Sequence, residues 1–272
     1  MKKSLLFFAA SLLLTTASAQ SLKFGLWAGG PDFSIGPTVN LEMPLDAWTF
    51  DVWLRAYLPN TDEISLGLGA KRAFEAGPAG RAEAGIKGFV GMDAHYWVEG
   101  FGKLTLGKIA LDLKVGNTYN RTPNHFWPLQ GETLGTYGRA DGKYRISRQL
   151  TLQGYVYAHE SGGQAEASLA WRQGAQTYTL GVGGVDRASR AYAVVGYKTP
   201  FAESLLTAEF RLGYINEFNL YYATNSYKAS LLLAYPARAQ VGIAWGSWML
   251  DMGVNDNGYD LYLRYEMPLE EM

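Results

Sequence analysis

The sequence predicts an all-β protein, a single up-and-down antiparallel transmembrane β-barrel of about 16 strands, with 14 to 18 possible. Three observations support this fold class. Apolar and polar residues alternate along most of the chain, short turn signals separate the alternating segments, and an export signal precedes them. The chain has 32 Gly but only 10 Pro, and no shift in composition marks a linker. One domain over residues 20–272 is therefore expected.

Residues 1–19 have the composition of a cleaved signal peptide. Lys2 and Lys3 form a basic start, LLFFAASLLL (5–14) is apolar, and Ala17-Ser18-Ala19 precedes Gln20 as a small-residue cleavage site. This ten-residue stretch is too short for a spanning helix, which needs about 20 residues. The chain has no cysteine, so neither a lipidated cysteine nor a disulfide is available to it.

The segment AWTFDVWLRAYL (47–58) shows the alternation clearly. Trp48, Phe50, Val52 and Leu54 share one face of a strand, and the other face carries polar and charged residues such as Asp51. Comparable apolar rows recur at 22–28, 35–43, 48–58, 64–70, 82–90, 96–98, 109–115, 150–158, 167–171, 178–182, 191–197, 206–214, 229–235, 241–245, 248–254 and 261–267. Neighbouring rows are expected to form antiparallel hairpins because the turn signals between them are short.

The size of the predicted barrel decides which face meets water. A closed barrel of about 16 strands is too wide for side chains to fill, so a dry apolar interior is not available to it. The apolar rows are therefore predicted to face lipid, with aromatic residues near the strand ends as interfacial girdles. A soluble sandwich of two packed sheets is the alternative, but sandwiches usually need longer crossing connections than these turns provide.

The chain resembles the bacterial outer-membrane β-barrel proteins of the porin-like class, although no particular porin family is matched. The resemblance rests on the signal peptide, the two-residue periodicity and units such as KYRISRQLTLQGYVYAHE (143–160) and YKTPFAESLLTAEFRLGYINE (197–217). It implies a location in the bacterial outer membrane, with the lipid bilayer and small hydrophilic solutes as partners. The oligomeric state cannot be read from these features.

Catalysis has little support in the sequence. His95, His125 and His159 lie far apart, and none belongs to a recognisable motif. No cofactor and no metal site is predicted. Without Lys2 and Lys3 the 24 basic residues fall to 22 against 25 acidic ones, so the mature chain has a net charge of −3 and no electrostatic basis for binding nucleic acid.

The polar rows carry the candidate functional residues, with both signs of charge intermixed. The predicted pore-lining residues are Asp51, Arg55, Asp112, Lys114, Arg139, Asp141, Lys143, Arg145, Glu209 and Arg211. Along residues 138–146 the four charges carry a net +2 and predict a weak preference for anions. The stiff segment 120–134, with His125, Phe126 and Trp127, is expected to fold across the mouth as a constriction loop.

Together these features favour a passive channel for small hydrophilic solutes and predict that the protein is not an enzyme. Two alternatives remain open at this point. One is a non-conducting structural or surface-interaction barrel. The other is an outer-membrane lipid hydrolase assembled from distant strands, with His95 or His159 as its base.

Overall fold

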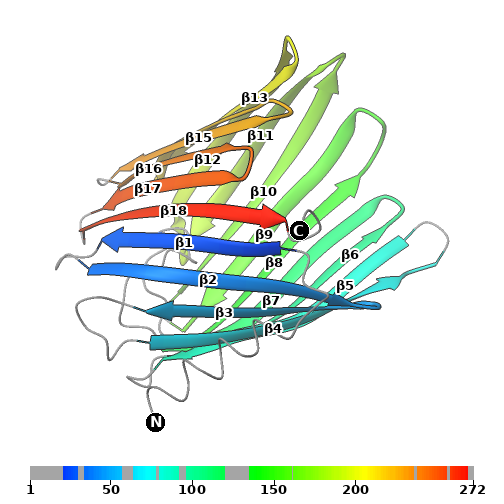
Figure 1. Cartoon of the computed structure of the whole chain (residues 1–272). Helices are drawn as coiled ribbons and strands as arrows, with labels where there is room; N and C mark the ends of the chain where they lie inside the picture. The colour runs from blue at the N-terminus through cyan, green and yellow to red at the C-terminus, as the bar shows by residue number, and fades with distance from the viewer. Residues whose placement is uncertain are drawn as a thin grey trace.

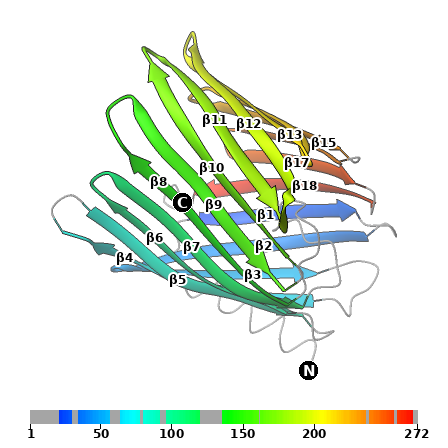
Figure 2. The same cartoon turned by 180° about the vertical axis from the view of Figure 1, so that it is seen from behind.

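The computed structural model is a closed antiparallel barrel of 18 strands (Figures 1 and 2). It describes residues 21–29, 34–56, 64–77, 80–91, 96–119, 135–160, 162–235, 238–255 and 258–268. The strands are β1 (Ser21–Gly29), β2 (Ser34–Leu45), β3 (Trp48–Ala56), β4 (Ile64–Glu75), β5 (Gly80–Gly91), β6 (Tyr96–Leu106), β7 (Ile109–Tyr119), β8 (Gly135–Arg145), β9 (Leu150–His159), β10 (Gly162–Gln173), β11 (Gln176–Val185), β12 (Arg187–Phe201), β13 (Ser204–Gly213), β14 (Asn216–Ala223), β15 (Tyr227–Tyr235), β16 (Arg238–Trp245), β17 (Trp248–Asn255) and β18 (Gly258–Pro268). Among these residues no helix is long and apolar enough to cross a membrane.

Each strand pairs with its neighbours in sequence, and β1 closes the barrel by pairing with both β2 and β18. Figure 1 shows the first and last strands side by side. Lys23 on β1 reinforces the closure through ion pairs of 3.5 Å to Glu42 on β2 and 3.5 Å to Glu266 on β18. The closed sheet leaves no open edge, so the backbone groups of both terminal strands are paired.

The barrel has two strands more than the central prediction of 16 but lies within the predicted range. The 16 apolar rows match every strand except β8 and β14. On β8 the outward positions include Gly138, Ala140 and Gly142, which are too small to form an apolar row. On β14 the outward row from Phe218 to Tyr222 is short. Tyr221, which occupies an inward position between its members, is also aromatic, so the alternation of apolar and polar residues is hidden.

The two ends of the barrel differ in their connections. At one end, which we call the turn end, no connection between strands is longer than four residues, whereas at the opposite end the connections reach 15 residues, between Tyr119 and Gly135. Five connections at the turn end are two-residue turns, at 46–47, 107–108, 174–175, 202–203 and 246–247. The first residue of each has a positive φ, between 52° and 61°, which suits the right-handed twist of the paired strands. The strands begin at Ser21 and finish at Pro268 at this same end. We call the opposite end the loop end. In outer-membrane barrels the short turns are periplasmic.

The apolar rows face outward, as predicted from the size of the barrel. Leu180 is 66% exposed and Val182 is 67% exposed, whereas Glu99 is 3% exposed and Tyr137 is 4% exposed. Burial is thus inverted relative to a soluble protein, with apolar side chains outside and polar ones against the wall inside. The soluble sandwich is excluded because a single closed sheet contains every described strand.

Aromatic residues ring the outer face at the turn end. The exposed members are Trp48, Phe74, Tyr144, Trp171, Tyr178, Phe201, Tyr227, Trp245 and Trp248. We call this set the turn-end girdle. Such belts lie at the level of the lipid headgroups, where one part of each ring meets hydrocarbon and another meets water.

Replacing Leu180 with Arg tests whether the apolar face of the strands meets lipid. A charge at this outward position in β11 should destabilise the inserted barrel by about 2 to 4 kcal/mol, because it meets hydrocarbon. Thr179→Arg, one residue away on the inner face, is the matched control and should be tolerated. Unfolding from lipid vesicles in urea measures both. Equal destabilisation by the two variants would contradict the assignment of faces.

Candidate functional site: the inner wall of the barrel

Side-chain contacts between strands that are not neighbours define the inner face of the barrel. Arg211 on β13 reaches Glu166 on β10, although β11 and β12 lie between these strands. Tyr155 on β9 and Tyr192 on β12 bring their hydroxyl groups to 3.4 Å across β10 and β11. Side chains converge in this way only on the concave side of a curved sheet. The charged and tyrosine rows therefore point into the barrel.

Arg211 is surrounded by three carboxylates, and we call this group the Arg211 cluster. Its guanidinium donates from Nε to Glu166 Oε2 at 2.8 Å and from Nη1 to Glu217 Oε1 at 2.7 Å. Nη2 lies 2.8 Å from Glu209 Oε1. The side chains of Arg211 and Glu166 are only 15% and 8% exposed. One cation for three anions leaves this part of the wall with a net charge of −2.

Hydrogen bonds from neighbouring strands fix the carboxylates of the Arg211 cluster. Gln164 Nε2 donates to the Tyr192 hydroxyl at 2.8 Å, and that hydroxyl donates to Glu166 Oε2 at 3.1 Å. Asn219 Nδ2 donates to Glu217 Oε1 at 2.7 Å. The predicted pore-lining set contains Arg211 and Glu209 but neither Glu166 nor Glu217. Only the register of β10 to β14 shows that these four residues meet.

A second buried group on the inner face joins a glutamate to aromatic rings. Trp97 Nε1 donates to the Tyr137 hydroxyl at 2.8 Å, and this hydroxyl donates to Glu99 Oε2 at 2.8 Å. Lys87 lies 3.3 Å from Glu99 Oε1 and 5.1 Å from the centroid of the Trp97 ring. The predicted pore-lining set contains none of these residues. All of them occupy the inward positions in the two-residue alternation of β5, β6 and β8, and this is the sequence signal that could have identified them.

Several inward aromatic rings lie flat over glycines of the adjacent strand. Tyr137 covers Gly116 so closely that a Cβ added to Gly116 would lie 2.5 Å from the ring. Tyr192 covers Gly183, Trp53 covers Gly67 and Phe101 covers Gly85 in the same way. A glycine under each ring lets a large side chain lie along the wall instead of projecting toward the barrel axis.

An ion pair neutralises the charges in one half of the positive row predicted along β8. Arg139 donates to both oxygens of Asp141, at 2.7 and 2.8 Å, and its guanidinium carbon lies 4.7 Å from the centroid of the Tyr155 ring. Lys143 and Arg145, nearer the turn end, are exposed and form no ion pair with another described residue. The net +2 of this row therefore resides on Lys143 and Arg145.

The remaining predicted pore-lining residues lie on the same face or outside the described part. Asp51, Asp112 and Lys114 occupy inward positions of β3 and β7. Asp112 is opposite Asp141 in the register, and its buried Oδ1 has no hydrogen-bond partner among the described residues. The side chain of Arg55 lies outside the described residues, as do His125, Phe126 and Trp127 of the predicted constriction loop.

Further basic residues lie on the inner face close to the turn end. Together with Lys143 and Arg145 they form a group that we call the basic collar: Arg81, Lys143, Arg145, Lys198 and Lys228. All five side chains are exposed, and none forms an ion pair with another described residue. The wall therefore carries exposed positive charge at the turn end, with Glu75 opposite Arg81 in the register, whereas the Arg211 cluster lies nearer the loop end.

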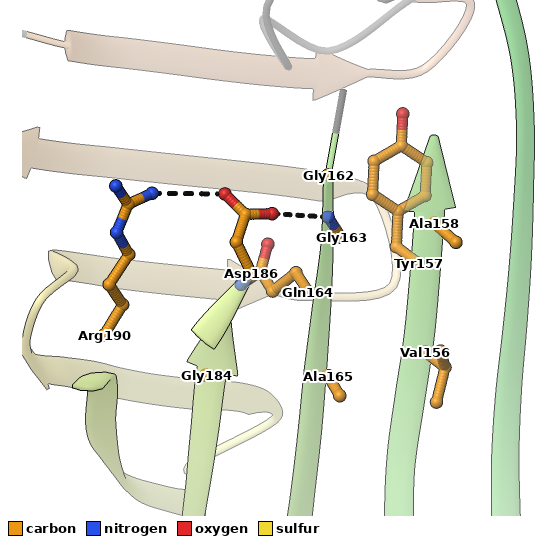
Figure 3. Close-up of a pocket in the computed structure, with 10 residues that line it drawn as sticks. All are labelled: Val156, Tyr157, Ala158, Gly162, Gly163, Gln164, Ala165, Gly184, Asp186 and Arg190. Atoms are coloured by element: carbon orange, nitrogen blue, oxygen red, sulfur yellow. Dashed lines mark hydrogen bonds and ion pairs between the residues drawn. The ribbon is translucent and has the colours of Figure 1, made fainter. Parts of the chain in front are cut away.

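A shallow hollow of about 750 Å³ lies at the loop end of β9 to β12 (Figure 3). Asp186 has φ 54° at a register shift between β11 and β12. Its carboxylate accepts a hydrogen bond from Gly163 N at 2.6 Å and pairs with Arg190 Nη1 at 3.2 Å, as the dashed lines show. The charged groups satisfy one another and the backbone, so these contacts hold the rim together.

The described residues contain no group of three or more His, Cys, Asp or Glu side chains that could hold a metal ion. His159 packs against Tyr157, with ring centroids 5.3 Å apart and ring planes tilted by 37°. His95 and His125 lie outside the described residues. The hydrolase alternative thus gains no structural support from His159, whose described ring contact is with an aromatic side chain.

No family model and no curated protein matches the sequence. Solved structures do match the fold. Pseudomonas aeruginosa OpdO is similar with a TM-score of 0.52 and 12% identity, over 92% of this chain and 97% of that one. Pseudomonas aeruginosa OpdL is similar with a TM-score of 0.50 and 11% identity, over 93% of this chain and all of that one. A variant of the Rh. blastica porin reaches a TM-score of only 0.40, at 9% identity over 92% of this chain and 99% of that one.

The likenesses to OpdO and OpdL establish the fold. The chain has the porin-like architecture of the bacterial outer-membrane β-barrels, as its residue pattern predicted. The outward apolar rows and the turn-end girdle suit the bilayer of that membrane.

Gly116→Val tests the seating of Tyr137 on the wall. The added side chain would displace the ring and break its hydrogen bonds to Trp97 and Glu99, which should destabilise the barrel by about 1 to 3 kcal/mol. Gly138→Ala is the control, because a Cβ there meets nothing closer than 3.8 Å. Denaturant unfolding with Trp fluorescence checks both. An unchanged unfolding midpoint for Gly116→Val would show that the ring does not depend on this glycine.

Arg211→Gln tests the Arg211 cluster. Removing the cation leaves three carboxylates close together and largely out of water, so the loss of stability should be about 3 to 5 kcal/mol. The double variant Arg211→Gln, Glu166→Gln should recover part of this loss because it also removes one of the repelling charges. The same unfolding measurement applies. A double variant less stable than the single one would contradict charge repulsion as the cause.

Proposed function

We propose that this protein is a passive channel that lets small hydrophilic solutes cross the bacterial outer membrane. The observation that carries the proposal is the combination of a closed barrel of 18 strands with a polar inner wall. Barrels of 16 to 18 strands enclose more space than wall side chains fill, and they leave an aqueous passage. The apolar outer rows supply the matching lipid-facing surface.

The arrangement of the inner side chains supports conduction. Large rings lie along the wall over glycines, as Tyr137 does over Gly116 and Tyr192 over Gly183. Charged groups such as Arg211 and Arg139 are held by carboxylates of the wall itself. Both features keep long side chains away from the axis of the barrel.

The pore-lining role of the predicted residues belongs to this proposal. Ion pairs within the wall neutralise many of the charged side chains, which hold water without attracting ions of one sign, although the Arg211 cluster keeps a net charge of −2. Lys143 and Arg145 act differently because they belong to the basic collar and lack a compensating anion among the described residues. Their charge favours anions, but weakly, since salt screens it with a Debye length of about 8 Å at physiological ionic strength.

Current through a planar bilayer tests the channel directly. Purified protein should give discrete conductance steps, and the reversal potential across a KCl gradient should show a weak preference for chloride. The double variant Lys143→Gln, Arg145→Gln should lose that preference, whereas the charge-preserving variant Lys143→Arg, Arg145→Lys should keep it. The preference should also fade at high salt.

Each outcome has a separate meaning. Folded protein that inserts without any current would contradict the channel and favour a non-conducting barrel. Current with a preference for cations, or a neutral variant that behaves like the wild type, would leave the channel intact and remove Lys143 and Arg145 from its functional residues.

A further inference from the structure

Arg72 is the single charged residue on the outer face among the strand residues whose side chains the structure describes. It belongs to the outward-facing row of β4 that also contains Leu68, Ala70 and Phe74. In the register it lies opposite Trp48 on one side and Ala84 on the other. All other charged side chains described on the strands lie on the inward positions. An arginine on a surface otherwise free of charge requires a physical explanation.

The guanidinium of Arg72 lies beside two aromatic rings of the turn-end girdle. Its central carbon is 5.6 Å from the centroid of the Trp48 ring and 5.2 Å from that of the Phe74 ring. These cation–π contacts orient the group, but the rings offer no oxygen to accept its hydrogen bonds. Among the described residues, no carboxylate or carbonyl accepts a hydrogen bond from Arg72, and its side chain is exposed.

The position of Arg72 along the barrel sets the chemistry it meets. Trp48 is the first residue after the turn at Asp46 and Ala47, and Ala73 N, the neighbour of Arg72, donates to Ala47 O at 3.3 Å. Arg72 therefore lies within the turn-end girdle at the level of the lipid headgroups. An arginine there costs little, whereas at the middle of the bilayer it would be strongly destabilising.

We propose that Arg72, flanked by Trp48 and Phe74, is a binding site for the phosphodiester group of a phospholipid in the leaflet at the turn end. The planar guanidinium can donate two parallel hydrogen bonds to two phosphate oxygens, a geometry that an ammonium group does not reproduce. The two rings hold the guanidinium on the barrel surface and contact the upper part of the lipid chains. The site does not depend on conduction through the barrel.

Lipid retention measured by native mass spectrometry tests the site. The full-length protein is equilibrated in detergent with a phosphatidylglycerol, a phosphatidylcholine or a diacylglycerol of the same acyl chains. Wild type should retain both phospholipids more strongly than the diacylglycerol, which has no phosphate. Arg72→Gln should retain the phospholipids about tenfold less, because it loses a charge-assisted hydrogen bond. Arg72→Lys should fall between the two, since it keeps the charge without the paired donors.

Arg172→Gln is the matched control. Arg172 lies near the same end but on the inner face, where its Nε donates to Gly174 O at 3.0 Å, so its loss should leave lipid retention unchanged. Equal retention by wild type and Arg72→Gln, or an equal loss in Arg172→Gln, would overturn the proposal. Displacement of the lipid by inorganic phosphate would also overturn it, by showing a site for a free anion.

Discussion

Closure of the backbone hydrogen-bond ladder is the constraint on which the rest of this structure depends. A backbone N–H or C=O left unpaired in hydrocarbon costs several kcal/mol, so a sheet within a bilayer cannot keep an open edge. Here β1 pairs with β2 on one side and β18 on the other, and Lys23 forms ion pairs with both neighbours. Since the chain has no cysteine and therefore no disulfide, this closed ladder is the frame that positions every side chain.

Closure determines where charge can lie. The outer rows must be apolar, so almost all charged side chains lie on the inner wall. There, neighbouring strands bring like charges together. Lys114 is directly opposite Arg139, and Asp112 opposite Asp141. Such pairs repel. The ion pair between Arg139 and Asp141 within β8 offsets part of this repulsion. Arg211 does the same for Glu166, Glu209 and Glu217 across β10, β13 and β14.

The sequence predicted the fold class and the faces of the strands because both depend on a local period of two residues. The central prediction of 16 strands is two short of the 18 observed, which lie within the predicted range, because the period is weak at Gly138 to Gly142 on β8 and at Tyr221 on β14. The inner clusters could not be predicted, since the contact between Glu166 and Arg211 joins residues 45 apart across two intervening strands. The register of the strands and the curvature of the sheet create that contact, and neither can be predicted from the alternation of apolar and polar residues. The net +2 predicted along β8 could not be assigned to particular residues, because only the structure shows that Arg139 pairs with Asp141.

The same distinction between compensated and uncompensated charge bears on how such a wall acts on ions. Arg139 and Arg211 are held by carboxylates at hydrogen-bonding distance, so at a distance each pair or cluster acts mainly as a dipole or a small net charge. The basic collar has no such partners among the described residues, and its field extends about one Debye length into the solution. The number of charges on the wall is therefore a poor guide to selectivity. We therefore expect the exposed charges at the turn end and the net −2 of the Arg211 cluster, rather than the neutral pairs, to act on a passing ion.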